Sequence, residues 1–276
     1  MEGVKEYEQR QGQQHNGHQG FDPFGGGGFH FNFGGHPFEE QVPDLFQNVD
    51  VYKMDLNNMG SFYRRREIWI VYFYNPKLDE CKRFEEAYTT ASEKLYGIIK
   101  VAAINCLAEE ELCEEFTVYD VPQILIFTEN LRDDGERYNG KQDWNSLANA
   151  ASKKMQNFVQ SVNQENFDAF MSRDQQKSKV LYFTDKKTTS AIMKSFSKRF
   201  LDKLSIGEVR HTDELSKKFG VQKFPQLLVV TDIESYAGDV YEGEMKVDQM
   251  SKFLSTYASQ QPKAVVKSKN FAKLTE

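Results

Sequence analysis

Short apolar runs alternate with amphipathic segments through most of the chain. Residues 68–74 form a continuous run of β-branched and aromatic side chains that ends before Pro76, a pattern typical of a buried strand. Beyond this run, apolar residues recur at steps of three and four, which predicts a helix with one apolar face. The residues on that face are Cys81, Phe84, Tyr88, Ala91 and Leu95.

The same patterns predict the remaining elements of this region. Strands are expected over 98–104 and 123–127, with an acidic helix over 107–116 between them and a turn around 136–140. Asp143 stands where it can cap a last helix. The apolar positions of that helix are Trp144, Leu147, Ala151 and Phe158. Because strand, helix and strand follow one another, the strands should pair in parallel and be covered by helices.

A second copy of this pattern follows the first. Residues 116–127 align without gaps on residues 219–230, with Phe, Val, Pro-Gln and Leu at the same offsets. Upstream, a Tyr-Phe pair at 72–73 matches another at 182–183. Two copies of one fold, each of about a hundred residues, therefore account for most of the chain. The second copy ends in a helix with Val247, Met250, Leu254 and Tyr257 on one face.

The two ends of the chain differ from this pattern in composition. Eight of the nineteen residues from Gly17 to Gly35 are glycine, with phenylalanines between them, which predicts a flexible linker. Alternatively, the phenylalanines of this segment bind weakly to exposed apolar segments of a client protein. After Gln261 the chain is basic and polar, as expected of a loose tail. The predicted organisation is an N-terminal segment over 1–40, a first domain over 41–162, a second domain over 166–262 and a flexible tail over 263–276.

Composition narrows the class of protein. The 276 residues are 39% hydrophobic and 13% aromatic, enough for real cores, so global disorder is excluded. No stretch reaches about eighteen consecutive apolar residues, the length that a membrane-spanning helix needs. A net charge of −6 argues against a chain-wide nucleic-acid surface, and three cysteines are too few for a disulfide scaffold.

Several blocks of the first copy resemble the thioredoxin-like domains of the protein disulfide isomerase family. Residues 71–76 look like the strand that leads into that family's active-site helix, and Cys81 stands where the second cysteine of its Cys-x-x-Cys motif falls. Residues 104–118 are similar to the stretch before the family's cis-proline, which Pro122 matches. Residues 134–140 fit its hairpin and the Tyr-x-Gly signature that follows.

This resemblance covers about residues 45–160 of the sequence. The second copy, over about 166–260, is a weaker match and looks like the non-catalytic domains of the same family. The resemblance implies an α/β chain of two tandem thioredoxin-like domains, preceded by a disordered Gly/Phe-rich segment. It also implies cis peptide bonds before Pro122 and Pro225, although few X-Pro bonds in folded proteins are cis.

The N-terminal segment carries a second resemblance. Glu6-Tyr7, followed by the Gly/Phe-rich stretch, looks like the end of a J-domain and its linker. A J-domain joined to thioredoxin-like domains is characteristic of J-domain co-chaperones of the endoplasmic reticulum lumen. The His-Pro-Asp motif of a J-domain does not occur, because His36-Pro37 continues with Phe38. The expectation is therefore such a co-chaperone without the J-domain proper.

The residues around Cys81 predict that the chain is not an enzyme. Dithiol exchange needs an exposed cysteine of low pKa at a helix N-terminus and a partner three residues later. Here the first position is Leu78, the family's preceding Trp is Lys77, and Tyr72 stands where the family keeps a buried carboxylate. Leu78 and Cys81 are therefore interpreted as a degenerate redox site, with no catalytic residue. Cys81 is expected to be buried, and a lone thiol that forms mixed disulfides with clients is the alternative.

The other cysteines and the histidines predict one disulfide and no metal site. Related luminal domains carry a pair similar to Cys106 and Cys113, so the resemblance implies a disulfide there in an oxidising compartment. No second cysteine pair and no nearby histidine completes a zinc site with four ligands. Four of the five histidines lie in the N-terminal segment and fit a solvated linker. No cofactor is expected.

These observations favour a redox-inactive chaperone module that binds unfolded or nascent clients through apolar surface. A luminal Hsp70 would be a partner only through the missing J-domain. The expected client contacts lie beside the two cis-proline loops: Tyr119, Val121, Pro122, Phe224 and Pro225. A weak thiol–disulfide oxidoreductase acting through Cys81 or through Cys106 and Cys113 is the alternative, and a scaffold that docks a partner is a third.

The predicted location depends on how the N-terminus is interpreted. Residues 1–10 are polar and charged with no apolar run behind them, so they contain no signal peptide. Taken literally, that predicts a cytoplasmic protein. The family resemblance instead implies the endoplasmic reticulum lumen, and neither a nucleic-acid partner nor a membrane span is expected.

Overall fold

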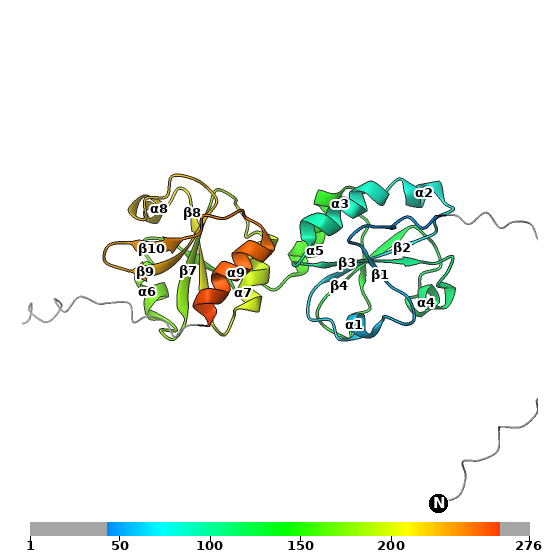
Figure 1. Cartoon of the computed structure of the whole chain (residues 1–276), viewed down its shortest axis with the longest axis horizontal. Helices are drawn as coiled ribbons and strands as arrows, with labels where there is room; N and C mark the ends of the chain where they lie inside the picture. Colours follow the sequence, from blue (N-terminus) through cyan, green and yellow to red (C-terminus); the bar gives the residue numbers. More distant parts are fainter. Residues whose placement is uncertain (1–42, 260–276) are drawn as a thin grey trace, which may run out of the picture. The chain divides into compact units, whose positions relative to one another are not determined.

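The computed structural model describes residues 43–259, which contain two five-stranded sheets of the same topology (Figure 1). We call the part from β1 to α5 the first fold. Its strands are β1 (Tyr52–Lys53), β2 (Trp69–Tyr74), β3 (Lys100–Asn105), β4 (Gln123–Phe127) and β5 (Glu136–Arg137). Its helices are α1 (Gly60–Tyr63), α2 (Asp79–Lys82), α3 (Glu85–Leu95), α4 (Glu110–Glu115) and α5 (Trp144–Lys154). The strand order is β1-β3-β2-β4-β5, with β1, β3 and β2 parallel and the other two antiparallel.

The second fold runs from β6 to α9 and repeats this arrangement. Its strands are β6 (Gln160–Val162), β7 (Ser178–Thr184), β8 (Leu204–Arg210), β9 (Gln226–Asp232) and β10 (Ala237–Val240). Its helices are α6 (Phe167–Ser172), α7 (Ala191–Arg199), α8 (Glu214–Lys218) and α9 (Val247–Ala258). The order β10-β9-β7-β8-β6 mirrors the first sheet, with β6 already paired to β8. The domain boundaries stay a prediction, and the predicted N-terminal segment and tail lie outside the described residues.

The predicted strands and the parallel βαβ unit are confirmed, and three details differ. The helix after β2 is interrupted, so that α2 ends at Lys82 and α3 begins at Glu85. The expected turn around 136–140 begins with the short strand β5, which pairs with β4. Trp144 and Phe158 are exposed rather than buried, because Trp144 opens α5 and Phe158 lies beyond its end.

Both faces of the first sheet are covered. All six side chains of β2 are buried, and alternate residues point to opposite faces of the strand. Ile70, Tyr72 and Tyr74 pack toward α3 and α5. Trp69, Val71 and Phe73 pack toward α1 and α4. The central strand therefore fixes where its carboxyl end, and the loop that follows it, lie.

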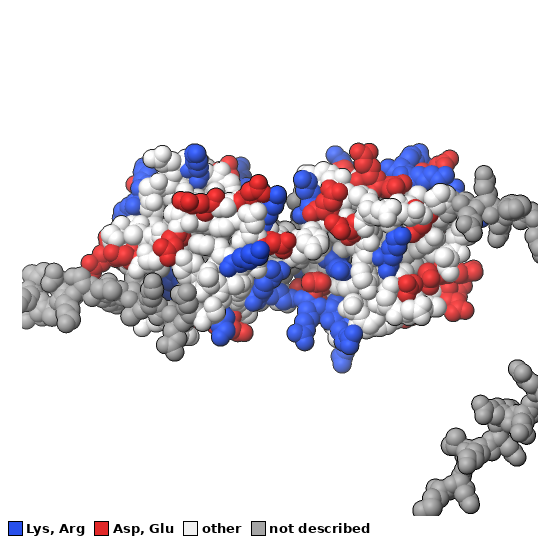
Figure 2. Space-filling model, viewed as in Figure 1, with Lys and Arg blue, Asp and Glu red and all other residues white. Residues whose placement is uncertain are grey.

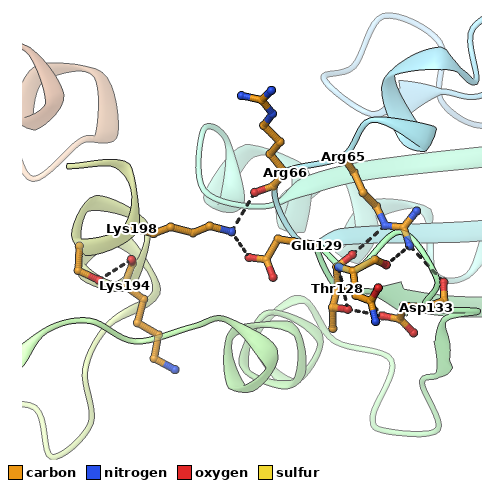
Figure 3. A network of polar contacts seen from close by, with 9 residues as sticks. Arg65, Arg66, Thr128, Glu129, Asp133, Lys194 and Lys198 are labelled. Atoms are coloured by element: carbon orange, nitrogen blue, oxygen red, sulfur yellow. Dashed lines mark hydrogen bonds and ion pairs between the residues drawn. The ribbon is translucent and has the colours of Figure 1, made fainter. Parts of the chain in front are cut away.

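Each fold buries one cation near the amino end of its central strand. Arg65 is 5% exposed and donates hydrogen bonds to the carbonyl oxygens of Thr128 at 2.7 Å, Asn130 at 2.6 Å and Asp133 at 3.1 Å (Figure 3). Its counterpart is Lys179, which is equally buried in β7. Lys179 donates to the carbonyl oxygens of Arg173 and Asp174 and to Ser205 Oγ. These buried donors hold loops whose carbonyl groups would otherwise be unsatisfied.

Side chains of α7 bond to the first fold. Lys198 Nζ donates to the carbonyl oxygen of Arg66 at 3.0 Å and lies 2.7 Å from Glu129 Oε1 (Figure 3). Arg199 donates to the carbonyl oxygen of Gly97 at 2.8 Å. Both folds belong to one compact unit of the chain. Within residues 43–259, no helix has the length and apolar character needed to cross a membrane.

Candidate functional site

Three loops meet at one edge of the first sheet. Because β2 and β3 run parallel and Tyr74 pairs with Asn105, both strands end at this edge. Strand β4 runs antiparallel and pairs Gln123 with Phe73, so it begins at the same edge. The loop edge of the first fold therefore consists of residues 75–81, 106–107 and 117–122. In α/β sheets, ligands commonly bind where parallel strands end.

Cys81 lies at this edge but is closed off from solvent. The thiol is free and fully buried, and its sulfur accepts a hydrogen bond from the backbone N–H of Asn75 at 3.4 Å. Leu78, three residues earlier, is 40% exposed at the start of α2 and supplies no side-chain cap. A single thiol without a partner cannot close a disulfide within this motif.

Aromatic rings fill the space behind Cys81. Phe46, Tyr72, Tyr74 and Phe84 contact one another at ring-centroid distances of 5.1 to 6.1 Å. The Tyr72 hydroxyl donates to the carbonyl oxygen of Cys81 at 3.2 Å. Burial, with a smaller effect of the neighbouring Cys81, raises the pKa of Tyr72 far above its ordinary value. Tyr72 therefore stays protonated near neutral pH and does not replace the family's proton-accepting carboxylate.

A carboxylate does lie at the outer end of this aromatic cluster. Asp44 accepts a hydrogen bond from the Tyr74 hydroxyl and lies 2.9 Å from Lys53 Nζ. Burial alone would raise the pKa of Asp44, but the bond from Tyr74 and the charge of Lys53 outweigh it and lower that pKa. No sequence motif points to Asp44, because it precedes the first strand and pairs across thirty residues.

A disulfide closes the β3 side of the loop edge. Cys106 and Cys113 are bonded, with their Cα atoms 5.8 Å apart, as the family resemblance implied. The bond ties the end of β3 to α4. Cys106 is partly exposed, whereas Cys113 is buried.

The loop before β4 presents an aromatic side chain to solvent. The Val121–Pro122 bond is cis, and Tyr119 on the same loop is 74% exposed. Val121 is partly buried against both cores of the first fold, which anchors the loop. The matching Phe224–Pro225 bond of the second fold is also cis, and Phe224 contacts His211 edge-on at 5.9 Å. The role of these residues as client contacts stays a prediction.

The corresponding edge of the second fold has different chemistry. No cysteine lies there, and β8 instead carries Glu208, which is 3% exposed. Arg210 Nη1 lies 2.5 Å from Glu208 Oε1 and also donates to the carbonyl oxygen of Lys186. Glu208 was not among the predicted site residues. A charged residue within a buried strand could have indicated it, because a buried charge needs a partner. Among residues 43–259, no three His, Cys, Asp or Glu side chains are grouped to hold a metal ion.

Comparisons with known proteins agree with the fold. The thioredoxin family model matches residues 49–153. A Dictyostelium discoideum protein that carries the name protein disulfide-isomerase is 32% identical over 69% of this chain and 48% of its own length. A protein disulfide-isomerase of Arthroderma benhamiae is 24% identical over 75% of this chain and 39% of its own length. The chain thus spans less than half the length of these relatives.

A solved structure extends the likeness to both folds. The crystal structure of full-length ERdj5 superimposes on 76% of this chain and 32% of its own length, with a TM-score of 0.55 and 15% sequence identity. At that identity the likeness shows the fold alone. Residues 49–153 therefore match the thioredoxin family, and the chain is similar over most of its length to proteins named protein disulfide-isomerase. A J-domain co-chaperone identity stays a prediction.

The relatives overturn one expectation from the sequence. Leu78 in place of a cysteine led to the prediction that the chain is not an enzyme. The relatives are named protein disulfide-isomerases, which are enzymes, so that prediction is wrong. The reasoning failed because the loss of one thiol affects one motif and excludes no chemistry elsewhere in the chain.

Proposed function

We propose that the chain, a thioredoxin-like relative of the protein disulfide-isomerases, assists protein folding by binding unfolded polypeptide at the loop edge of its first fold. The observation that carries this proposal is the exposure of Tyr119 on the anchored loop before cis-Pro122. Leu78 and Leu107, which follow β2 and β3 at the same edge, are exposed as well. Grouped apolar side chains mark interaction surfaces, and tyrosine is enriched where binding energy concentrates.

The backbone of this loop supports the same function. The N–H groups of Tyr119, Asp120 and Val121 donate to no other backbone group of the described residues. An extended client can pair with such free groups, and its side chains then contact the exposed apolar residues beside them. Binding of this kind recognises the backbone and the apolar side chains of a client rather than a particular sequence. A protein that assists the folding of many clients needs such broad recognition.

The test replaces Tyr119 with the residue at the matching position of the second fold. Residues 116–127 align on 219–230, which places Gln222 opposite Tyr119. Tyr119→Gln should weaken binding of a reduced, unfolded client by about three- to tenfold, since it removes one exposed aromatic contact. Leu131→Gln is the matched control, because Leu131 is exposed on the loop after β4, at the opposite edge of the sheet. Equal affinities of the two variants, measured by fluorescence anisotropy, would contradict the proposal.

Thiol–disulfide exchange is a second candidate function, favoured by the partial exposure of Cys106. A client thiolate would attack the Cys106 sulfur, and Cys113 would leave as a thiolate. A second client thiolate would then attack the client sulfur of the mixed disulfide and release Cys106. The client gains one disulfide, and the protein is left with two reduced cysteines. Cys81 is the weaker candidate because it is fully buried.

Mass spectrometry separates the two thiol candidates. A peptide with two reduced cysteines is incubated with the oxidised protein, and the oxidised peptide is counted after acid quenching. Cys106→Ser/Cys113→Ser should abolish peptide oxidation, whereas Cys81→Ser should leave it unchanged. Loss of oxidation in Cys81→Ser alone would contradict direct attack on Cys106, because Cys81 is a single thiol that can only relay the Cys106–Cys113 disulfide to the peptide.

We place this function in the endoplasmic reticulum lumen. A disulfide such as Cys106–Cys113 is typical of oxidising compartments and supports that location. Alkylation of the protein from its native cells, with and without prior reduction, tests it. Both cysteines should react only after reduction, and reaction without reduction would contradict luminal passage. A luminal Hsp70 partner stays a prediction, because no feature of the described residues tests it.

A further inference from the structure

A cleft of about 990 Å³ opens between the two folds. Each fold supplies two of its walls. The first fold contributes residues 93–98, at the end of α3 and just beyond it, and residues 144–153 of α5. The second fold contributes residues 186–194, before and within α7, and residues 245–248 at the start of α9. The cleft lies apart from the loop edge, because none of residues 75–81 or 117–122 lines it. No part of the proposed function uses this cleft.

The walls of the cleft are held in place by hydrogen bonds. Lys194 Nζ donates to the carbonyl oxygen of Ser152 at 2.8 Å, and Arg199 to that of Gly97 at 2.8 Å. The loop that carries Lys186 is fixed by Arg210, which donates to the Lys186 carbonyl oxygen. A cleft held in this way loses little conformational entropy when a ligand binds.

The cleft is basic on a chain that is acidic as a whole. Five lysines line it against Glu93 and Asp248, while the chain carries a net charge of −6. Lys94, Lys153 and Lys186 are exposed, and no carboxylate of residues 43–259 pairs with them. Figure 2 shows several Lys and Arg side chains near the junction of the two folds. Unpaired positive charge on pre-positioned walls favours an anionic ligand.

Apolar side chains stand beside these lysines. Tyr96 is 59% exposed, and Trp144 and Met245 are exposed as well. Of the twelve large hydrophobic side chains exposed among the described residues, three line this single cleft. Because Trp144 is the first residue of α5, its ring stays exposed and can contact a ligand in the cleft.

We propose that this cleft binds acidic segments of unfolded polypeptide that contain aromatic residues. The charge of the lysines selects the acidic side chains, and Tyr96, Trp144 and Met245 contact the aromatic ones. The chain's own C-terminal segment does not fit, because residues 261–276 contain four lysines and one glutamate. This inference rests on the proposed function for the presence of unfolded clients, but it concerns a separate site.

The experiment titrates the full chain with a labelled peptide of about twelve residues that alternates glutamate with phenylalanine, a length that spans about 40 Å when extended. A charge-reversed variant, Lys94→Glu/Lys153→Glu/Lys186→Glu, should raise the Kd at least about tenfold at low ionic strength. The matched control reverses three exposed lysines outside the cleft: Lys203, Lys223 and Lys252. It alters the net charge equally and should alter the Kd less than about twofold.

Several results would overturn the proposal. Equal weakening in the two triple variants would mean that the peptide senses net charge alone. No binding to the wild-type chain, or equal competition by a single-stranded oligonucleotide of the same charge, would also overturn it. Circular dichroism checks that the variants fold, and Lys186→Glu alone should give part of the effect if the triple variant does not fold.

Two further measurements localise the binding. Quenching of tryptophan fluorescence by the peptide should disappear in Trp144→Phe, since Trp69, the other tryptophan, is buried. Tyr119→Gln should leave the affinity for the acidic peptide unchanged. Retained peptide binding alongside weaker client binding in that variant would separate this site from the loop edge. Unchanged peptide binding in the lysine variant, with client binding still dependent on Tyr119, would reject the cleft and leave the proposed function intact.

Discussion

The two folds share one strand order but place different chemistry at the same edge of the sheet. In the first fold the edge carries Cys81, the Cys106–Cys113 disulfide and the exposed Tyr119. In the second fold Glu208 and Arg210 occupy this region and no cysteine is present. Topology alone therefore assigns no function to either edge. What distinguishes the two is which side chains reach solvent and which are closed off by packing.

The two folds also differ at the opposite edge of the sheet, where the central strand begins. Both bury a cation at the amino end of the central strand, but one uses arginine and the other lysine. Arg65 bonds four carbonyl oxygens and lies over the rings of Phe62 and Phe127. Lys179 bonds two carbonyl oxygens and one hydroxyl, beside the ring of Phe170. The planar guanidinium can satisfy more acceptors at fixed angles.

The largest expected effect follows from removing these buried cations. Arg65→Met should destabilise the first fold by about 3 kcal/mol, because four carbonyl oxygens lose a buried donor. Lys179→Met should destabilise the second fold by about 2 kcal/mol for the same reason. Hydrogen exchange resolves the two folds separately, and tryptophan fluorescence reports the first, which holds both tryptophans.

The control for this pair is an exposed cation of the same segment. Arg64→Met removes an exposed side chain whose one hydrogen bond to residues 43–259 goes to the carbonyl oxygen of Gly60, four residues earlier. Its effect should stay below about 0.5 kcal/mol. Equal destabilisation of the first fold by Arg64→Met and Arg65→Met would mean that the buried hydrogen bonds of Arg65 do not stabilise this fold.

The second prediction exchanges one residue between the folds. Thr117 has a positive φ of 56°, and the matching residue of the second fold is Gly220, with a φ of 64°. Threonine is strained in this region, while glycine adopts it freely. Thr117→Gly should therefore stabilise the first fold by about 0.5–1 kcal/mol, and Gly220→Thr should destabilise the second by about 1–2 kcal/mol.

The geometry isolates the backbone effect at this position. A Cβ atom at Gly220 would meet no atom within 4 Å, so the Cβ itself adds no steric contact. Urea unfolding of each variant, followed by hydrogen exchange for the second fold, measures both values. A loss of stability in Thr117→Gly would mean that contacts of the threonine side chain outweigh its backbone strain.

Periodicity predicted most of the fold but little of the site. A strand that is buried on both faces of a sheet needs a continuous apolar run. Such runs made it possible to predict the strand over 68–74 and the repeat of residues 116–127 at 219–230 from the sequence. The pairing of Asp44 with Tyr74, and the placing of Lys94 opposite Lys186, join positions far apart in sequence. No local pattern encodes such pairs, since they depend on how the elements pack. Tyr119 was found only because the family resemblance drew attention to its loop.

The smallest expected effect concerns acid stability, which should differ between the two folds. Asp44 is partly buried with its pKa held below the ordinary value of 3.8, whereas the second fold's lowered carboxylates, Glu214, Asp232 and Glu244, lie at the surface. A lowered pKa stabilises the folded state above the unfolded value, and the contribution is lost as the pH falls through the folded value. The first fold should therefore lose hydrogen-exchange protection before the second below about pH 4.

A variant of Asp44 connects that difference to one carboxylate. Asp44→Asn should remove up to about 1 kcal/mol of first-fold stability at pH 7 and less at pH 2, because the wild-type carboxyl takes up its own proton as the pH falls through its lowered pKa. The exposed Asp50→Asn, which removes the same charge from the same segment, should show no such convergence. If Asp44→Asn kept the same deficit at both values of pH, the contact with Tyr74 would stabilise through packing rather than charge. The ion pair with Lys53 would then contribute nothing to the acid sensitivity of the first fold.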